Sequence, residues 1–244
     1  MKYALLFCFL FMTHHFFGQS NETEKKFRQL KPDVWLGIWD KENSESKIKI
    51  DTLSYDDIPK YLDFRGIVVE ALKWKDNVSE KILVQTVTGQ FNWKNYEENS
   101  LDYMIQNKSE LYAYLFEKRH NENKFNFSWK IYDYTECFGV DWFTGFVPKG
   151  TTITDVNKDG ITEITIPYVL ICRGGMDPGT MKIIMYENRT KYALRGSTML
   201  GGCDGQFSYG GEYSASDNLK PNRLFMNFLT KRWNIHKCEN GRYY

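Results

Sequence analysis

One short stretch of this chain, within residues 153–168, has the residue types and spacing of a ligand set for a hard cation. Acidic and amide residues occupy alternate positions, a glycine follows, and a glutamate begins the next apolar run: Asp155, Asn157, Asp159, Gly160 and Glu163. Calcium takes six to eight oxygen ligands, and a tight loop supplies them from alternate residues whose side chains converge. The sequence therefore predicts a structural Ca²⁺ site that comprises the four oxygen-bearing side chains of this set and the backbone carbonyl of Ile161.

Two other interpretations of the loop have to be weighed. An EF-hand would carry an acidic residue at the twelfth position of the loop, where this chain has Ile166. An Asx-rich β-turn is the alternative that stays open, because Asn and Asp side chains readily cap their own backbone. The three carboxylates would repel one another in a loop without a cation, so we expect the ion to hold two strands together.

The chain shows no pattern typical of a catalytic centre. It has no H-E-x-x-H zinc motif, no phosphate-binding P-loop and no G-x-S-x-G nucleophile motif. Neighbouring carboxylates could serve a glycosidase, but adjacent acids are more often solvated turn residues. The acids and histidines considered are Asp56, Asp57, Glu97, Glu98, His120 and His236. We assign no catalytic residue to the sequence.

The first 18 residues have the composition of a secretory signal peptide. Lys2 precedes an apolar run from Ala4 to Met12, and small residues follow at Gly18 and Ser20. The apolar run is about half of the ~20 residues needed to cross a bilayer, which disfavours a membrane anchor. The sequence predicts export to the periplasm, the cell surface or the extracellular space, with cleavage after Gly18 or, alternatively, after Ser20.

The charge of the mature chain narrows the class of partner. Cleavage after Gly18 removes Lys2 and no acidic residue, so the formal net charge of +1 becomes zero. A nucleic-acid-binding protein would need a clear basic excess, so we exclude nucleic acid as a partner.

The same cleavage leaves four cysteines, and an even number in an exported chain favours disulfides. They are Cys137, Cys172, Cys203 and Cys238. Zinc binding is the alternative, but no two of them have C-x-x-C spacing and only two histidines could add ligands. The count alone leaves three pairings open.

The elements that must position these residues are predicted to be mainly β-strands, in one β-rich domain over 19–244. Alternating apolar and polar residues predict three antiparallel hairpins, formed by 65–74 with 81–87, by 111–118 with 125–134, and within 181–196. A capping box at Asn21 and Glu24 predicts a short helix through Leu30. Apolar residues at helical spacing between Leu224 and Trp233 predict an amphipathic C-terminal helix.

Two resemblances add to this interpretation. The loop resembles the D-x-[DN]-x-D-G-x-x-[DE] calcium loops of integrin-like, FG-GAP-type repeats. The span from about 110 to 197 resembles exported Gram-negative proteins described as surface polysaccharide biosynthesis proteins. The matching segments are ELYAYLFEK, SWKIYDYTEC, TITDVNKDGITEITIPY, the Cys172 turn with Asp177 and Pro178, and MKIIMYENRTKYALRG.

The second resemblance implies a disulfide pairing and a pathway, but no reaction. In that family, a cysteine after the W-K-I-Y-D strand accompanies one after the calcium-like strand, which implies Cys137 with Cys172 and leaves Cys203 with Cys238. Together with the lack of a nucleophile or base pattern and the scarcity of histidine, the resemblance predicts an exported, non-catalytic protein that assists surface polysaccharide biosynthesis or assembly by binding envelope glycan or a cell-surface protein. The alternative is an envelope glycan hydrolase or transferase that uses an unrecognised carboxylate pair.

Overall fold

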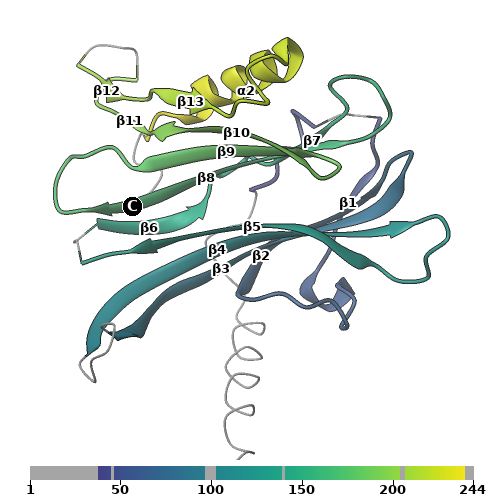
Figure 1. Ribbon diagram of the computed structural model, residues 1–244, viewed down its shortest axis with the longest axis horizontal. Coiled ribbons are helices and arrows are strands. Elements are labelled where there is room, and N and C mark those ends of the chain that lie inside the picture. Colours follow the sequence, from purple (N-terminus) through teal and green to yellow (C-terminus); the bar gives the residue numbers. More distant parts are fainter. Residues whose placement is uncertain (1–37, 45–46, 97–102, 139–140, 204–206, 240–244) are drawn as a thin grey trace, which may run out of the picture.

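The computed structural model describes residues 38–44, 47–96, 103–138, 141–203 and 207–239, which form a mainly β structure of antiparallel sheets (Figure 1). The expected fold class is therefore confirmed. The predicted signal peptide, the predicted helix at 21–30 and the Glu97-Glu98 pair lie outside the described residues. Among the residues that are described, no helix is long and apolar enough to cross a membrane.

The first sheet has five strands in the order β1-β2-β3-β4-β5, each antiparallel to its neighbour. They are β1 (Ile50–Thr52), β2 (Ile67–Lys75), β3 (Ser79–Tyr96), β4 (Tyr103–Arg119) and β5 (Asn126–Glu136). The first two predicted hairpins correspond to β2–β3 and β4–β5. The turn between β2 and β3 is closed by Asp76, whose carboxylate accepts hydrogen bonds from the backbone N–H groups of Val78 and Ser79.

The second sheet has six strands, ordered β13-β10-β9-β8-β6, with β7 paired to β8. They are β6 (Asp141–Phe146), β7 (Thr152–Thr154), β8 (Glu163–Arg173), β9 (Thr180–Glu187), β10 (Thr190–Ser197) and β13 (Tyr213–Ala215). The third predicted hairpin is β9–β10, and Asn188 takes the positive φ of 52° that its two-residue turn favours. A small separate pair is formed by β11 (Met199–Leu200) and β12 (Tyr209–Gly210).

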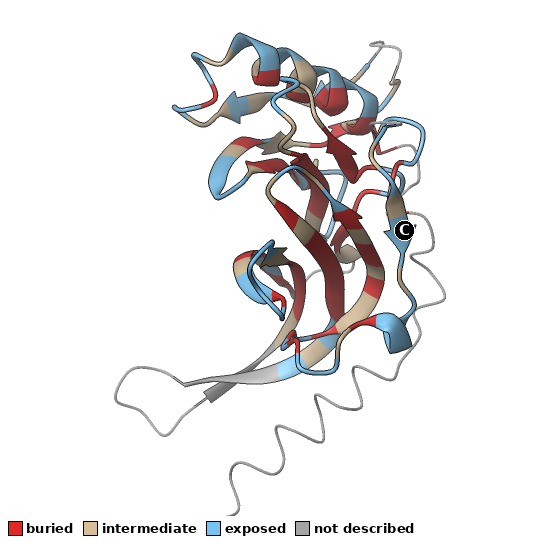
Figure 2. Ribbon diagram, turned by 90° about the vertical axis from the view of Figure 1, so that its right-hand side faces the viewer, coloured by how far each residue is buried: buried red, intermediate tan, exposed pale blue. Residues whose placement is uncertain are grey.

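The main core fills the space between the two sheets, and the ribbon coloured by burial shows buried residues on the facing strands (Figure 2). Alternate residues of each strand point inward, as the period of two requires. Aromatic and aliphatic side chains from both sheets meet there, including Trp74, Leu83, Leu115, Trp129, Ile164, Ile166 and Tyr186. The indole of Trp129 stacks on the ring of Tyr186 with centroids 4.0 Å apart, which joins the edge strand β5 to β9.

Two smaller clusters cover the outer faces of the sheets. The short 3-10 turn η1 (Tyr55–Asp57) and the segment after it place Ile58, Leu62 and Phe64 on the outer face of the first sheet. Helix α2 (Arg223–His236) covers the outer face of the second sheet. Its buried stripe includes Phe225, Leu229 and Trp233, as the helical spacing predicts. The layers therefore follow in this order: the segment around η1, the first sheet, the second sheet and helix α2.

The four cysteines lie in the two pairs that the resemblance implies. Cys137 follows β5 and bonds to Cys172 in β8, with their Cα atoms 5.4 Å apart, so this bridge joins one sheet to the other. Cys203 bonds to Cys238, with Cα atoms 5.9 Å apart, and links the segment after β11 to the residues that follow α2.

Candidate metal centre

The predicted loop closes the hairpin between β7 and β8. Thr154 pairs with Glu163 at the base of the hairpin, and residues 155–162 form the turn. Gly160 has a φ of +82°, and a Cβ atom there would lie 1.8 Å from the Nδ2 atom of Asn77. The backbone N–H of Asn77 also donates to the carbonyl of Gly160 at 3.0 Å. Glycine is favoured here because of the positive φ, and also because the loop packs directly on the β2–β3 turn of the other sheet.

Part of the loop has the hydrogen bonds of an Asx turn. The N–H of Asp159 donates to Asn157 Oδ1 at 3.2 Å, and the N–H of Ile161 donates to Asp159 Oδ1 at 2.8 Å. The N–H of Gly160 donates to Asp155 Oδ2 at 3.1 Å. These contacts stabilise the turn without any ion, as the alternative interpretation predicts.

Two carboxylate oxygens at the base of the loop are not explained by that turn. Glu163 is buried, and its Oε2 accepts from the N–H of Val156 at 2.8 Å and the hydroxyl of Thr154 at 3.2 Å. Its Oε1 is buried without a hydrogen-bond partner among the described residues, and so is Oδ1 of Asp155. A buried acceptor without a partner is unfavourable by about 1–3 kcal/mol, and more if it is charged. A cation is one kind of partner that such an oxygen accepts.

Burial and neighbouring carboxylates make ionisation of Glu163 unfavourable. Burial, with a smaller contribution from the nearby carboxylate of Glu187, raises the pKa of Glu163 to about 7. Burial also raises the pKa of Glu187, and the charges of Asp159 and Asp155 add to that effect. Negative charge is therefore concentrated at this end of the hairpin. No basic side chain contributes to the shifted pKa values of Glu163 and Glu187.

Glu187 belongs to this cluster although the sequence pattern does not include it. It ends β9 directly opposite Glu163 in the strand register, and it accepts a 2.6 Å hydrogen bond from the side-chain amide of Asn157. No local spacing could reveal it, because 24 positions separate it from Glu163 and only the pairing of β8 with β9 brings the two together.

The donor set fits a hard cation. The side chains of Asp155, Asn157, Asp159, Glu163 and Glu187 offer oxygen ligands and no sulfur or imidazole, which is the preference of calcium rather than zinc. Among the described residues, however, no group of three or more acidic, histidine or cysteine side chains is arranged to hold a metal ion. The role of the Ile161 carbonyl as a ligand stays a prediction.

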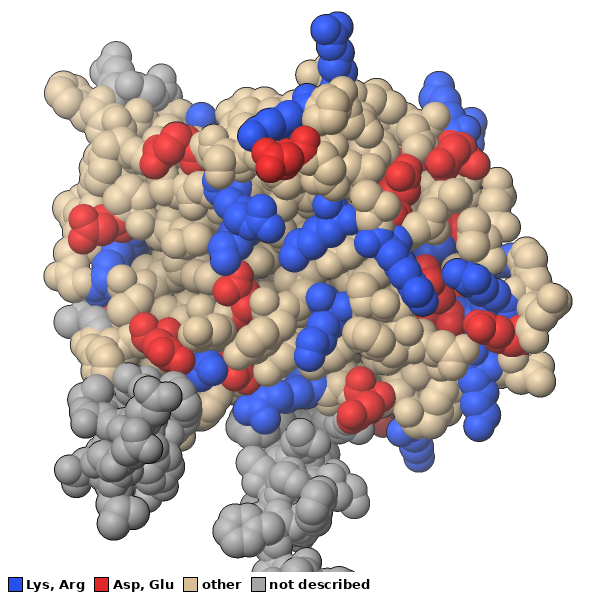
Figure 3. All heavy atoms as spheres, in the orientation of Figure 1, with Lys and Arg blue, Asp and Glu red and all other residues tan. Residues whose placement is uncertain are grey.

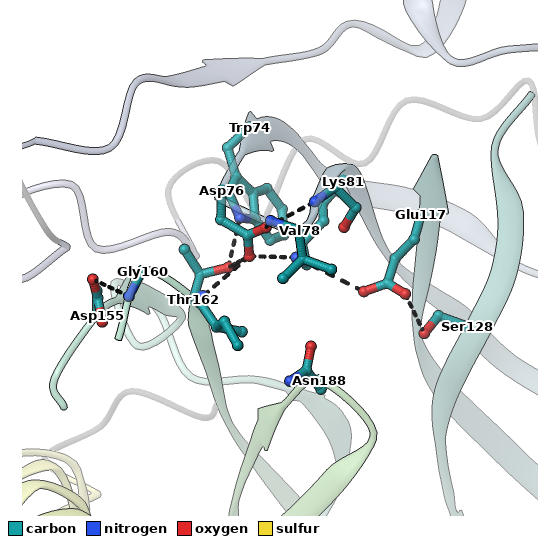
Figure 4. Close-up of polar contacts among 12 residues, drawn as sticks. Trp74, Asp76, Val78, Lys81, Glu117, Ser128, Asp155, Gly160, Thr162 and Asn188 are labelled. Atoms are coloured by element: carbon teal, nitrogen blue, oxygen red, sulfur yellow. Dashed lines mark hydrogen bonds and ion pairs between the residues drawn. The ribbon is translucent and has the colours of Figure 1, made fainter. Parts of the chain in front are cut away.

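A second polar network joins the loop to the first sheet (Figure 4). Asp76 Oδ2 accepts from the N–H and the hydroxyl of Thr162 at 3.1 and 2.9 Å, and it forms a short ion pair with the Lys81 ammonium group. The Trp74 indole N–H donates to the Thr162 hydroxyl at 2.9 Å. The residue just before β8 is therefore fixed to the β2–β3 hairpin by buried polar contacts.

The other candidate residues are not drawn together into a catalytic arrangement. Asp57 caps the η1 turn through its hydrogen bonds with Ser54, and Asp56 beside it is exposed. His120 is exposed in the β4–β5 turn, whereas His236 is buried at the end of α2.

The described residues therefore form a β-protein of two main sheets, with two pairs of disulfide-bonded cysteines and an acidic turn between β7 and β8. Compared with known protein families, curated proteins and solved structures, the chain has no significant match.

Proposed function

We propose that this chain is an exported, non-catalytic protein, stabilised by calcium, that assists the biosynthesis or assembly of cell-surface polysaccharide by binding envelope glycan or a partner protein. Export is supported by the leader sequence and by the two cysteine pairs, because disulfides form and persist in oxidising compartments. The polysaccharide role is supported by the sequence resemblance over residues 110–197.

The observation that carries the calcium part of the proposal is the pair of buried, unpartnered oxygens on Asp155 and Glu163. A bound Ca²⁺ would compensate the charge of the loop and stiffen the junction between the two sheets. Its ligands would come from the side chains of Asp155, Asn157, Asp159 and Glu163 and from the carbonyl of Ile161, with Glu187 as an additional carboxylate.

The pocket between β5 and β8 is one place where the enzyme alternative can be tested. It has a volume of about 280 Å³, and Glu136 is the single acidic residue among those that line it. A two-carboxylate glycosidase mechanism requires a pair of acids across the scissile bond.

Deletion of the gene tests the pathway, and the purified protein tests the activity. We expect the deletion to change the amount or length of surface polysaccharide, and we expect the protein to bind that glycan or a cell-surface protein without turning the glycan over. Normal polysaccharide in the deletion strain would contradict the role. Glycan turnover that is lost on replacing one Asp or Glu would instead establish the enzyme alternative.

Calcium is tested by calorimetry of metal-free protein with and without added Ca²⁺. If the ion binds only the folded state, the free energy of unfolding should rise by about 2.7 kcal/mol at a hundredfold excess over Kd. Asp159→Ala should abolish this increase. An equal melting temperature with and without calcium, together with no bound metal, would leave the loop as an Asx turn.

A further inference from the structure

Strand β5 is an edge strand of the first sheet, and basic side chains of the second sheet lie beside it. Asp133 of β5 reaches across to β8 and β9, where it accepts from the Tyr168 hydroxyl at 2.9 Å and pairs with the Lys182 ammonium group at 2.5 Å. The next strand outward, β10, carries Lys191 and Arg195, whose side chains are both exposed. We name the surface formed by Asp133, Lys182, Lys191 and Arg195 the ledge.

The strand register places the three cations on one face of the sheet. Arg195 lies directly opposite Lys182, and Lys191 lies opposite Tyr186, whose ring packs against β5. Like charges at directly opposed positions of an antiparallel pair are destabilising. Lys182 is compensated by Asp133, whereas the residues opposite Arg195 in the strand register are Ser214 and Lys182, neither of which is acidic.

The ledge has more positive charge than its one carboxylate can compensate. Although Lys191 is exposed as a whole residue, partial desolvation of its ammonium group lowers its pKa, and the charges of Arg195 and Lys182 also lower it, while Asp133 acts in the opposite direction. Asp133 is already engaged by Lys182 and by Tyr168. Figure 3 shows a band of Lys and Arg side chains that crosses the middle of this face of the molecule, over β9, β10 and β5.

A polar pocket adjoins the ledge. It is the pocket of about 280 Å³ at the end of β5, and it is lined by Tyr134, Thr135 and Glu136 on one side and by Leu170 and Thr180 on the other. Leu170 pairs with Thr180, two residues along from the pairing of Tyr168 with Lys182. At about 3.4 Å per residue, the pocket and the ledge are roughly 7 Å apart along the strands.

The ledge offers cationic side chains that could pair with carboxylates of a ligand. The pocket offers hydroxyl groups that could form hydrogen bonds with neutral polar groups of a ligand. The Tyr134 side chain is 43% exposed at the pocket, and Thr180 is also exposed. A polymer of acidic sugars presents carboxylates and ring hydroxyls at regular intervals, so it matches both parts. A peptide rich in acidic residues would also match the ledge, but it would bring carboxylates rather than hydroxyl donors to the pocket, where the carboxylate of Glu136 is an acceptor.

We propose that the ledge and the adjoining pocket bind an acidic polysaccharide whose sugar units carry carboxylates. This inference rests on the proposed function, because it names the class of glycan that the protein recognises. The contacts are ion pairs from Arg195, Lys191 and Lys182 to carboxylates, with hydrogen bonds to sugar hydroxyls in the pocket.

The test measures binding of alginate oligosaccharides to the purified full-length mature protein by calorimetry. A neutral dextran oligosaccharide of equal length and a polyglutamate peptide of equal charge are compared with alginate. The variant Lys191→Gln/Arg195→Gln removes two exposed charges from the ledge. Its matched control, Lys49→Gln/Lys231→Gln, removes two exposed charges far from the ledge in sequence. Lys49 directly precedes β1, and Lys231 belongs to α2.

We expect alginate to bind, dextran to bind at least tenfold more weakly, and alginate affinity to fall as salt is added. The ledge variant should lose at least tenfold in alginate affinity, while the control variant should stay within twofold of the wild type. Absence of alginate binding, or equal binding by the ledge variant, would overturn the inference. Polyglutamate binding as tight as alginate binding would overturn it in favour of an acidic peptide.

The host's own polysaccharide separates this inference from the proposed function. If the wild type and the ledge variant bind the host glycan equally, the ledge inference fails and the polysaccharide role stands. If deletion of the gene leaves the polysaccharide unchanged, the role fails whatever the alginate result.

Discussion

Replacement of Asp76 by Asn should destabilise the protein strongly, because this carboxylate is the buried junction between the two sheets. The side chains of Asp76 and Lys81 are only 2% and 1% exposed. Asp76 accepts backbone hydrogen bonds from Val78 and Ser79 at 2.9 and 3.0 Å, in addition to the two contacts with Thr162. The amide of Asn keeps the shape but removes the charge and one acceptor oxygen.

The expected loss follows from what remains buried. Removing one partner of a buried ion pair is unfavourable by about 3–5 kcal/mol, since the other charge stays without compensation. Lys81 has a second acid, Glu117, at 3.8 Å, so we expect the lower half of this range. With a urea m-value of about 2–3 kcal/mol per molar, the unfolding midpoint should fall by about 1–2 M.

The effect should depend on pH in a defined direction. Burial alone would raise the pKa of Asp76, but its hydrogen bond and ion pair with Lys81 hold that pKa below the usual value. A lowered pKa contributes stability that is present above the unfolded value near 4 and is lost as the pH falls through the folded value. The difference in the free energy of unfolding between the wild type and Asp76→Asn should therefore be largest at neutral pH and should narrow below about pH 4.

Urea denaturation of the wild type, Asp76→Asn, Lys81→Met and the double variant measures the loss and the coupling. The double variant should lose less than the sum of the two single variants, because neither charge is then left buried alone. Asp56→Asn, at an exposed acid, is the matched control and should change the stability by less than about 0.5 kcal/mol. A loss below about 1 kcal/mol for Asp76→Asn would refute the idea that this pair joins the sheets.

Three further predictions concern the loop and the disulfides. Because burial raises the pKa of Glu163 to about 7, metal-free protein should lose about 3 kcal/mol of stability as the pH rises from about 4.5 to about 7, and Glu163→Gln should flatten that profile in urea denaturation. A profile that is flat in the wild type would contradict the burial argument. Glu187→Gln should weaken calcium binding by about tenfold in calorimetry, whereas the exposed Glu42→Gln should not change it, and equal affinities would exclude Glu187 as a ligand. Cys137→Ser with Cys172→Ser should destabilise the protein by about 3–4 kcal/mol, since the bridge closes a loop with a sequence separation of 35, and non-reducing peptide mapping that finds other pairs would contradict this connectivity.

The hairpins and the C-terminal helix could be predicted because their signals are local. The alternation of Phe125, Phe127, Trp129 and Ile131 with polar residues corresponds to β5, although a register shift near Phe116 places Phe127 outward, where it is 54% exposed. Strands of two or three residues, such as β7 and β13, carry too few residues to show a period, and their pairing comes from the sheet they join.

The loop itself was visible in the sequence, but its surroundings were not. Spacing identifies Asp155 and Glu163, yet Glu187 joins them only through the register of β8 with β9. The requirement for Gly160 likewise has two causes, a turn that the sequence shows and contact with Asn77 that it does not. The ledge depends on which strand ends the first sheet, and no local pattern contains that information.

Strand β8 is fastened to the first sheet by different means at its two ends. Near its last residues, the Cys137–Cys172 bridge is covalent, while just before its first residue Thr162 is held by hydrogen bonds to Asp76. Partial opening of the domain should therefore be directional, starting where the contacts are reversible. Amide hydrogens in the first half of β8 should exchange with solvent sooner than those near Cys172. Reduction of the bridge should remove this difference in exchange rate between the two ends of the strand.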